Sequence, residues 1–195
     1  VATNKSDKVL SVKINEVKPD TQFGVTLKNI DLEVYQSEIL GIGGVAGNGQ
    51  EELMQILTGE KIDQNVSLKY MDNDIQMLNP RERREMGLAF APEERLGHAA
   101  VANLNLLENS LITDPKKRFL KKMGFINFVE LNLYTNEIIE KFNVKTTGAS
   151  ALASSLSGGN LQKFVVGREI GQKPSLFVVN QPTWGVDALS AANIR

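Results

Sequence analysis

The sequence predicts an α/β fold in which a glycine-rich loop joins a strand to a helix and a block of helices interrupts the sheet. A short apolar run at residues 38–43 (EILGIG) leads into the loop, and helix-forming residues follow at 50–57. From residue 104 to residue 142 the apolar spacing is helical. A second apolar run at residues 176–179 (LFVV) is typical of a parallel strand buried on both faces.

Two further strands are predicted ahead of the loop. Residues 9–17 (VLSVKINEV) alternate apolar and polar side chains, and residues 25–34 do so more loosely. Pro19, Asp20 and Gly24 between them are residues that form turns. The N-terminal element is therefore expected to be an antiparallel β hairpin on a half-buried sheet.

The rest of the chain alternates between strand and helix signals. Residues 66–70 favour a strand, and Pro80 suits the first turn of a short charged helix. Residues 87–91 (GLAFA) predict a buried strand. In the helical block, the spacing of three leucines predicts one shared face: Leu104, Leu107 and Leu111.

Composition sets limits on function. The 195 residues, 42% of them hydrophobic and 23% charged, suit one globular domain. A net charge of −1 gives no broad positive field, so no binding to nucleic acid is expected. The chain has no cysteine and only one histidine, His98, which excludes disulfides and argues against a zinc site.

The ends of the sequence and its hydropathy suggest a piece of a larger protein. No stretch approaches the roughly 20 apolar residues that cross a bilayer, and the N-terminus has no secretion signal. The chain begins at Val1 and stops at Arg195 within what resembles a new helix. We interpret it as an excised fragment.

The glycine-rich loop matches the spacing G-x-x-x-x-G of a phosphate-binding loop, and it lies between strand and helix as such a loop must. Backbone N–H groups and the helix N-terminus would face the phosphate. The loop residues are Gly44, Val45, Ala46, Gly47, Asn48, Gly49, Gln50 and Glu51. The pattern requires Lys and then Ser or Thr where Gln50 and Glu51 stand, so both phosphate neutralisation and Mg²⁺ binding are weakened. A glycine-bearing turn without any ligand gives the same spacing.

A second candidate site is the sequence LSGGNLQK at residues 156–163. Ser157, Gly158 and Gly159 precede a helix that is expected to start near Asn160, which would place a hydroxyl and consecutive N–H groups at a helix N-terminus. These groups together form an anion site. The alternative, which S-G-G alone favours, is an ordinary serine-capped helix.

A third candidate site follows the apolar strand at 176–179. Asn180 and Gln181 lie at its carboxyl end, the edge that faces the ligand crevice in a doubly wound sheet. A nucleotide hydrolase would place a metal-binding Asp and a catalytic Glu there. An amide cannot accept a proton from water, and loss of a general base costs about 10²- to 10⁴-fold in rate. Alternatively, the two amides merely end the strand before Pro182.

The joint order of these motifs resembles the ABC ATPase domain along nearly the whole chain. LSGGNLQK resembles the family's signature motif. The segments GVAGNGQEEL, NPRERREMGLAFAPEERLG and NQPTWGVD look most like the second ATPase half of bacterial tandem importers for nucleosides, with importers of simple sugars close behind. The sugar relatives usually carry an arginine-type phosphate loop and keep D-E before P-T, and this chain departs from both patterns.

The resemblance implies a P-loop NTPase core with an N-terminal antiparallel β hairpin, an inserted helical subdomain and a missing C-terminal part. Residues 1–92 would form the first part of the core, residues 93–163 the helical subdomain, and residues 164–195 the return to the core. The switch histidine of the family would lie beyond the end of this chain.

The resemblance also assigns a role to each site. ABC ATPases pair head to tail, so each ATP lies between the phosphate loop of one domain and the signature motif of the other. The chain's own phosphate loop (Walker A) and Walker B positions, Asn180 and Gln181, are degenerate, and its own site is expected to be weak or inactive. The signature residues Ser157, Gly158 and Gly159 would complete the active site of the partner half.

Three other residues gain roles by resemblance. Glu93 takes the place of the family's Q-loop glutamine, within a hinge at residues 92–95, although a solvated charge cluster would look the same. Asp187 corresponds to the D-loop aspartate at the dimer interface. Phe23 is a candidate for stacking on adenine, but an aromatic residue on a hairpin more often serves packing.

The implied ligands are ATP and Mg²⁺, and no residue is assigned as a metal ligand. The implied partners are the N-terminal ATPase half of the same polypeptide, the transmembrane permease subunits and, indirectly, an extracytoplasmic solute-binding protein. The implied location is the cytoplasmic face of the bacterial inner membrane. Two alternatives stay open: an assembly domain that binds no nucleotide, and a soluble ABC ATPase of translation or DNA repair.

Overall fold

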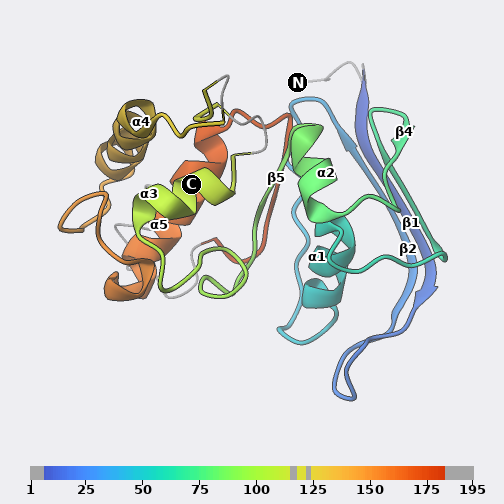
Figure 1. Ribbon diagram of the computed structural model, residues 1–195. Helices are drawn as coiled ribbons and strands as arrows, with labels where there is room; N and C mark the ends of the chain where they lie inside the picture. Colours follow the sequence, from blue (N-terminus) through green and yellow to red (C-terminus); the bar gives the residue numbers. More distant parts are fainter. Residues whose placement is uncertain (1–6, 115–117, 122–123, 183–195) are drawn as a thin grey trace. The chain divides into compact units, whose positions relative to one another are not determined.

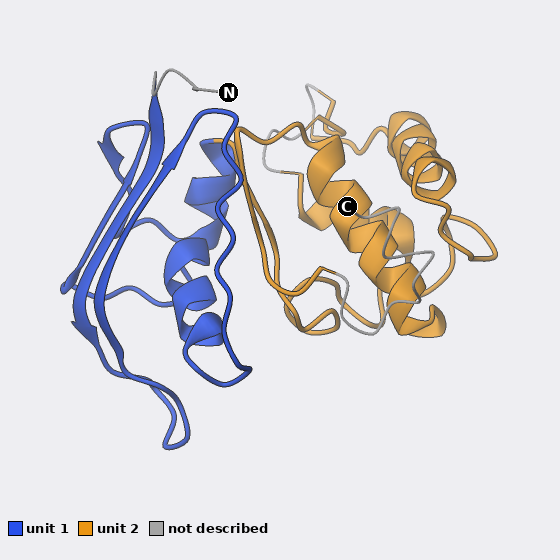
Figure 2. Ribbon diagram, turned by 180° about the vertical axis from the view of Figure 1, so that it is seen from behind, with its two compact units in different colours: residues 1–86 blue, residues 87–195 orange. Residues whose placement is uncertain are grey.

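The computed structural model describes residues 7–114, 118–121 and 124–182, and the chain divides into two compact units, Val1–Met86 and Gly87–Arg195. Figure 2 shows the two units in different colours. Each is described by itself below. The sequence-based division at residues 92 and 163 stays a prediction.

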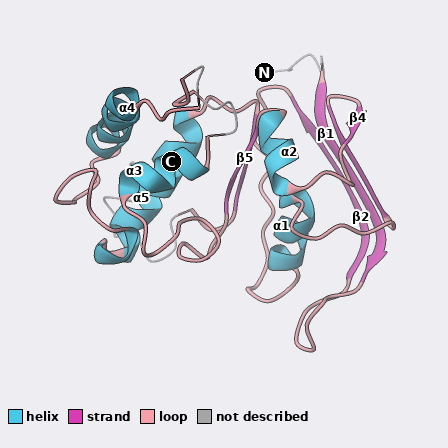
Figure 3. Cartoon of the chain, in the orientation of Figure 1, coloured by secondary structure: helices cyan, strands magenta, loops and turns pink. Residues whose placement is uncertain are grey.

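The first unit is built on a four-stranded antiparallel sheet with the order β2-β1-β3-β4 (Figures 1 and 3). Its strands are β1 (Lys8–Val17), β2 (Leu27–Tyr35), β3 (Val66–Tyr70) and β4 (Asn73–Asp74). β1 pairs with both β2 and β3, and the register places Val12 opposite Leu32 and Leu68. Val12, Ile14 and Leu68 are almost completely buried, as the period-two alternation requires. The predicted hairpin is confirmed.

Two helices complete the first unit, α1 (Gln50–Thr58) and α2 (Pro80–Glu85), and both lie on one face of the sheet (Figure 1). Asn79 caps α2 in a reciprocal capping box with Glu82, and Pro80 opens the helix as predicted.

Arg83, on α2, is 1% exposed and links the two helices of this unit. It donates hydrogen bonds to the carbonyl groups of Ile56 and Leu57 at the C-terminal end of α1, and to the carbonyl groups of Gln76 and Leu78. Burial lowers the pKa of Arg83 to about 10, so the guanidinium stays charged at neutral pH. It therefore satisfies carbonyl groups that the end of a helix otherwise leaves without partners.

The second unit contains a two-stranded parallel sheet of β5 (Leu88–Ala91) and β6 (Leu176–Val179) and the helices α3 (Leu106–Ile112), α4 (Phe128–Lys141) and α5 (Gly158–Gly171). A single 3₁₀ turn, Ala153–Ser155, precedes α5. Leu106, Ile138 and Phe164, one from each helix, belong to the same apolar core. The predicted helices within residues 104–142 are confirmed as α3 and α4, and α4 packs against both α3 and α5.

A buried ion pair fixes α5 within this core. Arg168 and Glu169 are both almost fully buried, with 2.8 Å between Arg168 Nη2 and Glu169 Oε1. Arg168 also donates to the carbonyl groups of Ala99 and Asn109. Because charges can be buried only when they are paired and hydrogen-bonded, this network ties α5 to the segment around α3.

Two sequence-based expectations about strands are wrong. Residues 38–43 form no strand, and Ile39 is 98% exposed and Ile42 54% exposed. A strand is defined by its ladder with a neighbour, and in the described part of the chain no strand pairs with this segment. β6 is not buried on both faces: its first three residues are partly exposed and Val179 is exposed, whereas its partner β5 is buried throughout.

The leucines that were predicted to share a face are only partly buried: Leu104 precedes α3, and Leu107 and Leu111 lie on it. The residues that α3 buries are Leu106, Asn109 and Ser110. Asn109 is buried because its side chain accepts from the N–H of Val101 and donates to the carbonyl groups of Val101, Leu104 and Asn105. A polar side chain that is fully satisfied thus occupies a position on the buried face of α3.

None of the helices in the described ranges has the length and apolarity to cross a bilayer.

Candidate functional site

The phosphate loop at residues 44–49 precedes α1 in the first unit. Gly47 and Gly49 have φ angles of 83° and 101°, a region that favours glycine, and a Cβ at Gly49 would lie 2.7 Å from Leu27 Cδ2. Gly49 is the N-cap of α1 and no side chain caps the helix. The loop therefore has the backbone of an anion-binding loop at a helix N-terminus.

Gln50 folds back onto this loop. Its Oε1 accepts a hydrogen bond from the Asn48 N–H at 3.0 Å, and its Nε2 donates to the Val45 carbonyl at 3.0 Å. Asn48 Nδ2 also donates to the Val45 carbonyl, at 3.0 Å. The loop thus satisfies internally one of the N–H groups that a phosphate would need, and it contains no lysine to neutralise phosphate charge.

The two glutamates that follow Gln50 have different surroundings: Glu51 is exposed, and Glu52 is hydrogen-bonded to the backbone before β2. Glu51 is exposed in the first turn of α1, where a carboxylate favours the helix but disfavours a bound anion. Glu52 Oε1 accepts from the Val25 N–H at 2.7 Å and so anchors the start of β2. Glu52 is therefore a structural residue, a role that its position in the sequence did not indicate.

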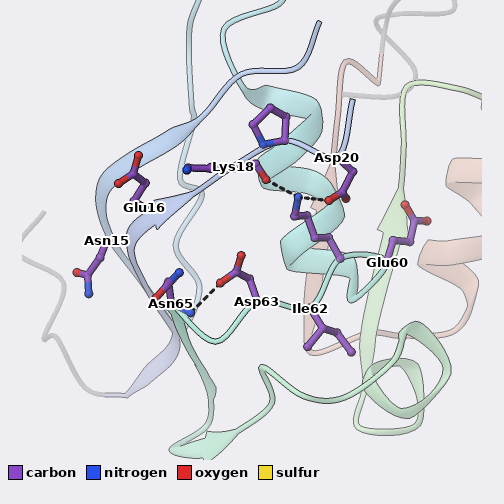
Figure 4. Close-up of a pocket in the computed structure, with 10 residues that line it drawn as sticks. Asn15, Glu16, Lys18, Asp20, Glu60, Ile62, Asp63 and Asn65 are labelled. Atoms are coloured by element: carbon purple, nitrogen blue, oxygen red, sulfur yellow. Dashed lines mark hydrogen bonds and ion pairs between the residues drawn. The ribbon is translucent and has the colours of Figure 1, made fainter. Parts of the chain in front are cut away.

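A cleft of about 720 Å³ lies at the opposite end of α1 from the loop, among residues before β2 and after α1 (Figure 4). Lys61 crosses it, is only 10% exposed, and donates to the Lys18 carbonyl and to Asp20 Oδ1. Its lining also carries the carboxylates of Glu16 and Glu60. Carboxylates in the lining repel a phosphate, and Lys61 is already paired with Asp20, so the cleft does not favour a phosphate.

The strand ends of the second unit bring together two residues that the sequence identified separately. The register of the parallel pair sets Ala91 opposite Val179, and the Asn180 N–H extends the ladder to the Ala91 carbonyl at 2.9 Å. Immediately beyond, Gln181 Nε2 donates to Glu93 Oε2 at 2.9 Å. Gln181 also has a φ angle of 45°, a left-handed conformation that is uncommon for residues other than glycine. An amide and a carboxylate thus face each other at this edge.

The signature motif forms the N-terminus of α5. The helix begins at Gly158, and its N-cap, Ser157, makes no hydrogen bond from its side chain to the helix N–H groups. Ser157 Oγ instead accepts from Asn160 Nδ2 at 2.9 Å, and Asn160 Oδ1 accepts from the Lys145 N–H at 2.9 Å. Ser157 is thus the N-cap residue of α5, but its hydroxyl does not cap the helix as the serine-capped alternative required.

The remaining predicted residues are placed as follows. Phe23 is 94% exposed, so the packing role expected of an aromatic on a hairpin is wrong. His98 lies 3.4 Å from Glu94 Oε2, and the described residues contain no cluster of metal-ligating side chains. Asp187 lies outside the described residues.

Comparison with known proteins now identifies the family. The profile of the family described as "ABC transporter" matches residues 27–184. The chain belongs to the ABC transporter family. It is 36% identical over 187 residues to the nucleoside import ATP-binding protein NupA of Lactococcus lactis, which covers 95% of this chain and 37% of the relative.

Two further relatives are similar. The chain is 34% identical to the guanosine import ATP-binding protein NupO of Bacillus subtilis over 95% of this chain and 36% of the relative. It is 31% identical to the ribose import ATP-binding protein RbsA of Clostridium tetani, over 83% of this chain and 32% of the relative. The chain therefore spans only about a third of the length of these import proteins.

Among solved structures, the dimeric post-hydrolysis state of the ATP-binding cassette MJ0796 bound to ADP and Pi superposes with a TM-score of 0.78. The sequence identity is 19%, and the match covers 95% of this chain and 79% of that one. At this identity the likeness shows the fold alone. The predicted fold class, an ABC ATPase P-loop fold with an antiparallel N-terminal sheet, is confirmed.

Proposed function

We propose that this chain is an ATP-binding, energy-coupling domain of a bacterial importer for nucleosides or simple sugars. In this proposal it is the second half of a tandem polypeptide, its signature motif completes the ATP site of the first half, and its own phosphate loop holds nucleotide weakly. One contrast carries the proposal. The Ser157 hydroxyl does not bond to the first N–H groups of α5, whereas in the loop before α1 the Asn48 N–H already donates to Gln50 Oε1.

The phosphate loop of this chain is proposed to bind an anion more weakly than the signature motif does. A phosphate must displace Gln50 Oε1 from the Asn48 N–H before it can bind there, and it meets Glu51 and no lysine. At the strand ends, Asn180 and Gln181 are amides that cannot accept a proton from an attacking water. These features support a site that binds nucleotide without hydrolysing it.

The signature motif retains what an in-trans site needs. The N–H groups of Gly158 and Gly159 and the hydroxyl of Ser157 are expected to bind the terminal phosphate of a nucleotide held on the partner half. Mg²⁺ on that nucleotide would neutralise phosphate charge and is held by the partner's own residues. Asp187 is proposed to lie at the interface between the two halves.

The relatives' names support the proposed partners. NupA, NupO and RbsA are named as import ATP-binding proteins, and an import ATPase acts on a transmembrane permease. We therefore propose a location at the cytoplasmic face of the membrane, with an extracytoplasmic solute-binding protein as an indirect partner. The net charge of −1 supports a partner other than nucleic acid.

Substitution of Ser157 by arginine tests the in-trans role. In the full tandem polypeptide with its permease, Ser157→Arg places a bulky side chain over the N-terminus of α5 and should lower ATPase and uptake rates by about 100-fold or more. Ser154→Arg, at an exposed position in the preceding 3₁₀ turn, is the matched control and should retain activity. Unchanged rates in Ser157→Arg would refute the proposal.

The closure of the phosphate loop by Gln50 favours a second candidate, an assembly domain that binds no nucleotide and only presents the signature motif. Calorimetric titration with ATP and Mg²⁺ separates the two. Heat that saturates in the millimolar range supports weak binding at the loop, and an absence of heat at millimolar ATP supports the assembly domain. The Ser157→Arg test does not distinguish these candidates, because both use the signature motif.

A further inference from the structure

We infer that Arg95 is a phosphate-binding residue of the signature site, where its guanidinium adds a positive charge to the uncapped N-terminus of α5. The inference rests on the proposed function, because the phosphate in question belongs to a nucleotide held by the partner half. Arg95 lies far from the motif in sequence, and neither glycine spacing nor helix capping points to it.

Arg95 is anchored on the first turns of α5. Its Nε donates to Gln162 Oε1 at 3.0 Å, and Gln162 lies one helical turn after Gly158 and is 1% exposed. The buried Gln162 therefore fixes the direction of the guanidinium. The Arg95 backbone is also held, since its carbonyl accepts from the Ala100 N–H at 2.7 Å.

The space above Gly158 is occupied by this guanidinium. A Cβ at Gly158 would lie 2.9 Å from Arg95 Nη1 and 3.7 Å from Arg95 Cζ. Gly158 does not have a left-handed backbone, so conformational freedom is not what requires a glycine here. A larger residue at position 158 would therefore have to displace the guanidinium from the helix start.

The guanidinium of Arg95 lies at the N-terminus of α5, where the helix itself carries a partial positive charge. Both charges favour a bound anion at this position. The N-cap Ser157 does not use its hydroxyl to cap the helix. Gln162 Nε2 is also buried without a hydrogen-bond partner. Uncapped N–H groups, an unsatisfied amide and a guanidinium together indicate a site completed by a bound anion.

A phosphate group has the chemistry that this arrangement fits. A guanidinium presents paired N–H donors that match the oxygens of a phosphate, and such charge-assisted hydrogen bonds are stronger than those between neutral groups. Arg95 forms and breaks no covalent bond in this role. It neutralises charge on the terminal phosphate, and Gln162 is a positioning residue that orients it.

The test uses the full tandem polypeptide reconstituted with its permease, with the KM for ATP as the readout. Arg95→Gln should raise KM about tenfold, because it removes the charge on the phosphate. Arg95→Lys keeps the charge but loses the paired donors and the bond to Gln162, so its KM should lie between those of the parent and Arg95→Gln. Arg81→Gln is the matched control, because Arg81 is an exposed arginine paired with Glu85 on α2, and it should leave KM unchanged.

A second variant tests the geometry without changing any charge. Gly158→Ala is compatible with a helix, but its Cβ must push the guanidinium aside, so KM should rise by about threefold. In the Arg95→Gln background the same change should add nothing. If Arg95→Gln fails to fold, as judged by its circular dichroism, Gly158→Ala is compared in the parent and in Arg95→Lys instead. A rise in KM in the parent that is smaller in Arg95→Lys supports the inference, and equal rises contradict it.

Several outcomes would overturn the inference. It fails if Arg95→Gln leaves KM within twofold of the parent, if Arg95→Lys is as impaired as Arg95→Gln, or if the effects of Gly158→Ala and Arg95→Gln are additive. Ser157→Arg separates this failure from failure of the proposed function. If Ser157→Arg stops hydrolysis while Arg95→Gln is harmless, only the role of Arg95 is lost.

Discussion

The two helices α1 and α5 begin in similar ways and offer different anion sites. Each follows a glycine-containing loop, and neither has a side-chain cap at its N-terminus. At α1 the amide of Gln50 folds back and occupies the Asn48 N–H. At α5 the N-cap hydroxyl of Ser157 is held by Asn160, and the guanidinium of Arg95 lies beside Gly158. The two helix starts therefore differ in the side chain beside them: an amide that occupies a backbone N–H before α1, and a guanidinium at α5.

The side chains at the proposed sites are held by local hydrogen bonds. The amide of Gln50 bonds to the Asn48 N–H and the Val45 carbonyl, within the loop that contains Gly47 and Gly49. In the other unit, the strand-end pair of Glu93 and Gln181 keeps one carboxylate and one amide within hydrogen-bonding distance. Both features are contacts between side chains that a substitution can test.

A lysine at position 50 should strengthen ATP binding at the phosphate loop and so reduce the difference between the two helix starts. Gln50→Lys removes the acceptor that occupies the Asn48 N–H and adds a positive charge. Calorimetry should then give an affinity for ATP about 10- to 100-fold higher, the equivalent of one charge-assisted contact. Gln36→Lys adds the same charge at an exposed position after β2 and should have no effect. Equal affinities for the parent and Gln50→Lys would show that Gln50 does not limit binding.

A smaller change should follow from altering the strand-end pair. Gln181→Glu would place two carboxylates at the 2.9 Å contact with Glu93, and we expect a loss of stability on the order of 1 kcal/mol. The temperature of unfolding measures this loss. Addition of Glu93→Gln should restore most of it, because an amide and a carboxylate again face each other. A double variant no more stable than Gln181→Glu would contradict the pairing.

The smallest effect is expected at Asn160, whose side-chain amide donates a hydrogen bond to Ser157 Oγ. Asn160→Ala removes the hydrogen bond to Ser157 Oγ and leaves the Lys145 N–H without its acceptor. The KM for ATP of the tandem polypeptide should rise about two- to fivefold. Asn136→Ala removes an exposed asparagine contact on α4 and serves as the control. A KM unchanged by Asn160→Ala would show that the hydroxyl needs no such support.

The sequence predicted most elements of both units but missed the parts that depend on neighbours. Alternation found the β1–β2 hairpin, and Pro80 marked the start of α2. The apolar run at residues 38–43 also had the composition of a strand, yet it forms no ladder in the described chain. The buried face of α3 was missed because Asn109, a polar residue, is satisfied by the loop before the helix. Hydropathy cannot detect a partner that lies elsewhere in the chain.

By itself, the sequence determined the family and the order of the three motifs, and it predicted weakened chemistry at Gln50, Glu51, Asn180 and Gln181, because these follow from residue type and order along the chain. Only the tertiary structure decided which side chains reach one another: Gln181 with Glu93, and Arg95 with Gln162. These partners are separated by 88 and 67 positions in the sequence. Hydrogen bonds act over about 3 Å, so such contacts arise only when packing brings distant strand ends and helices together.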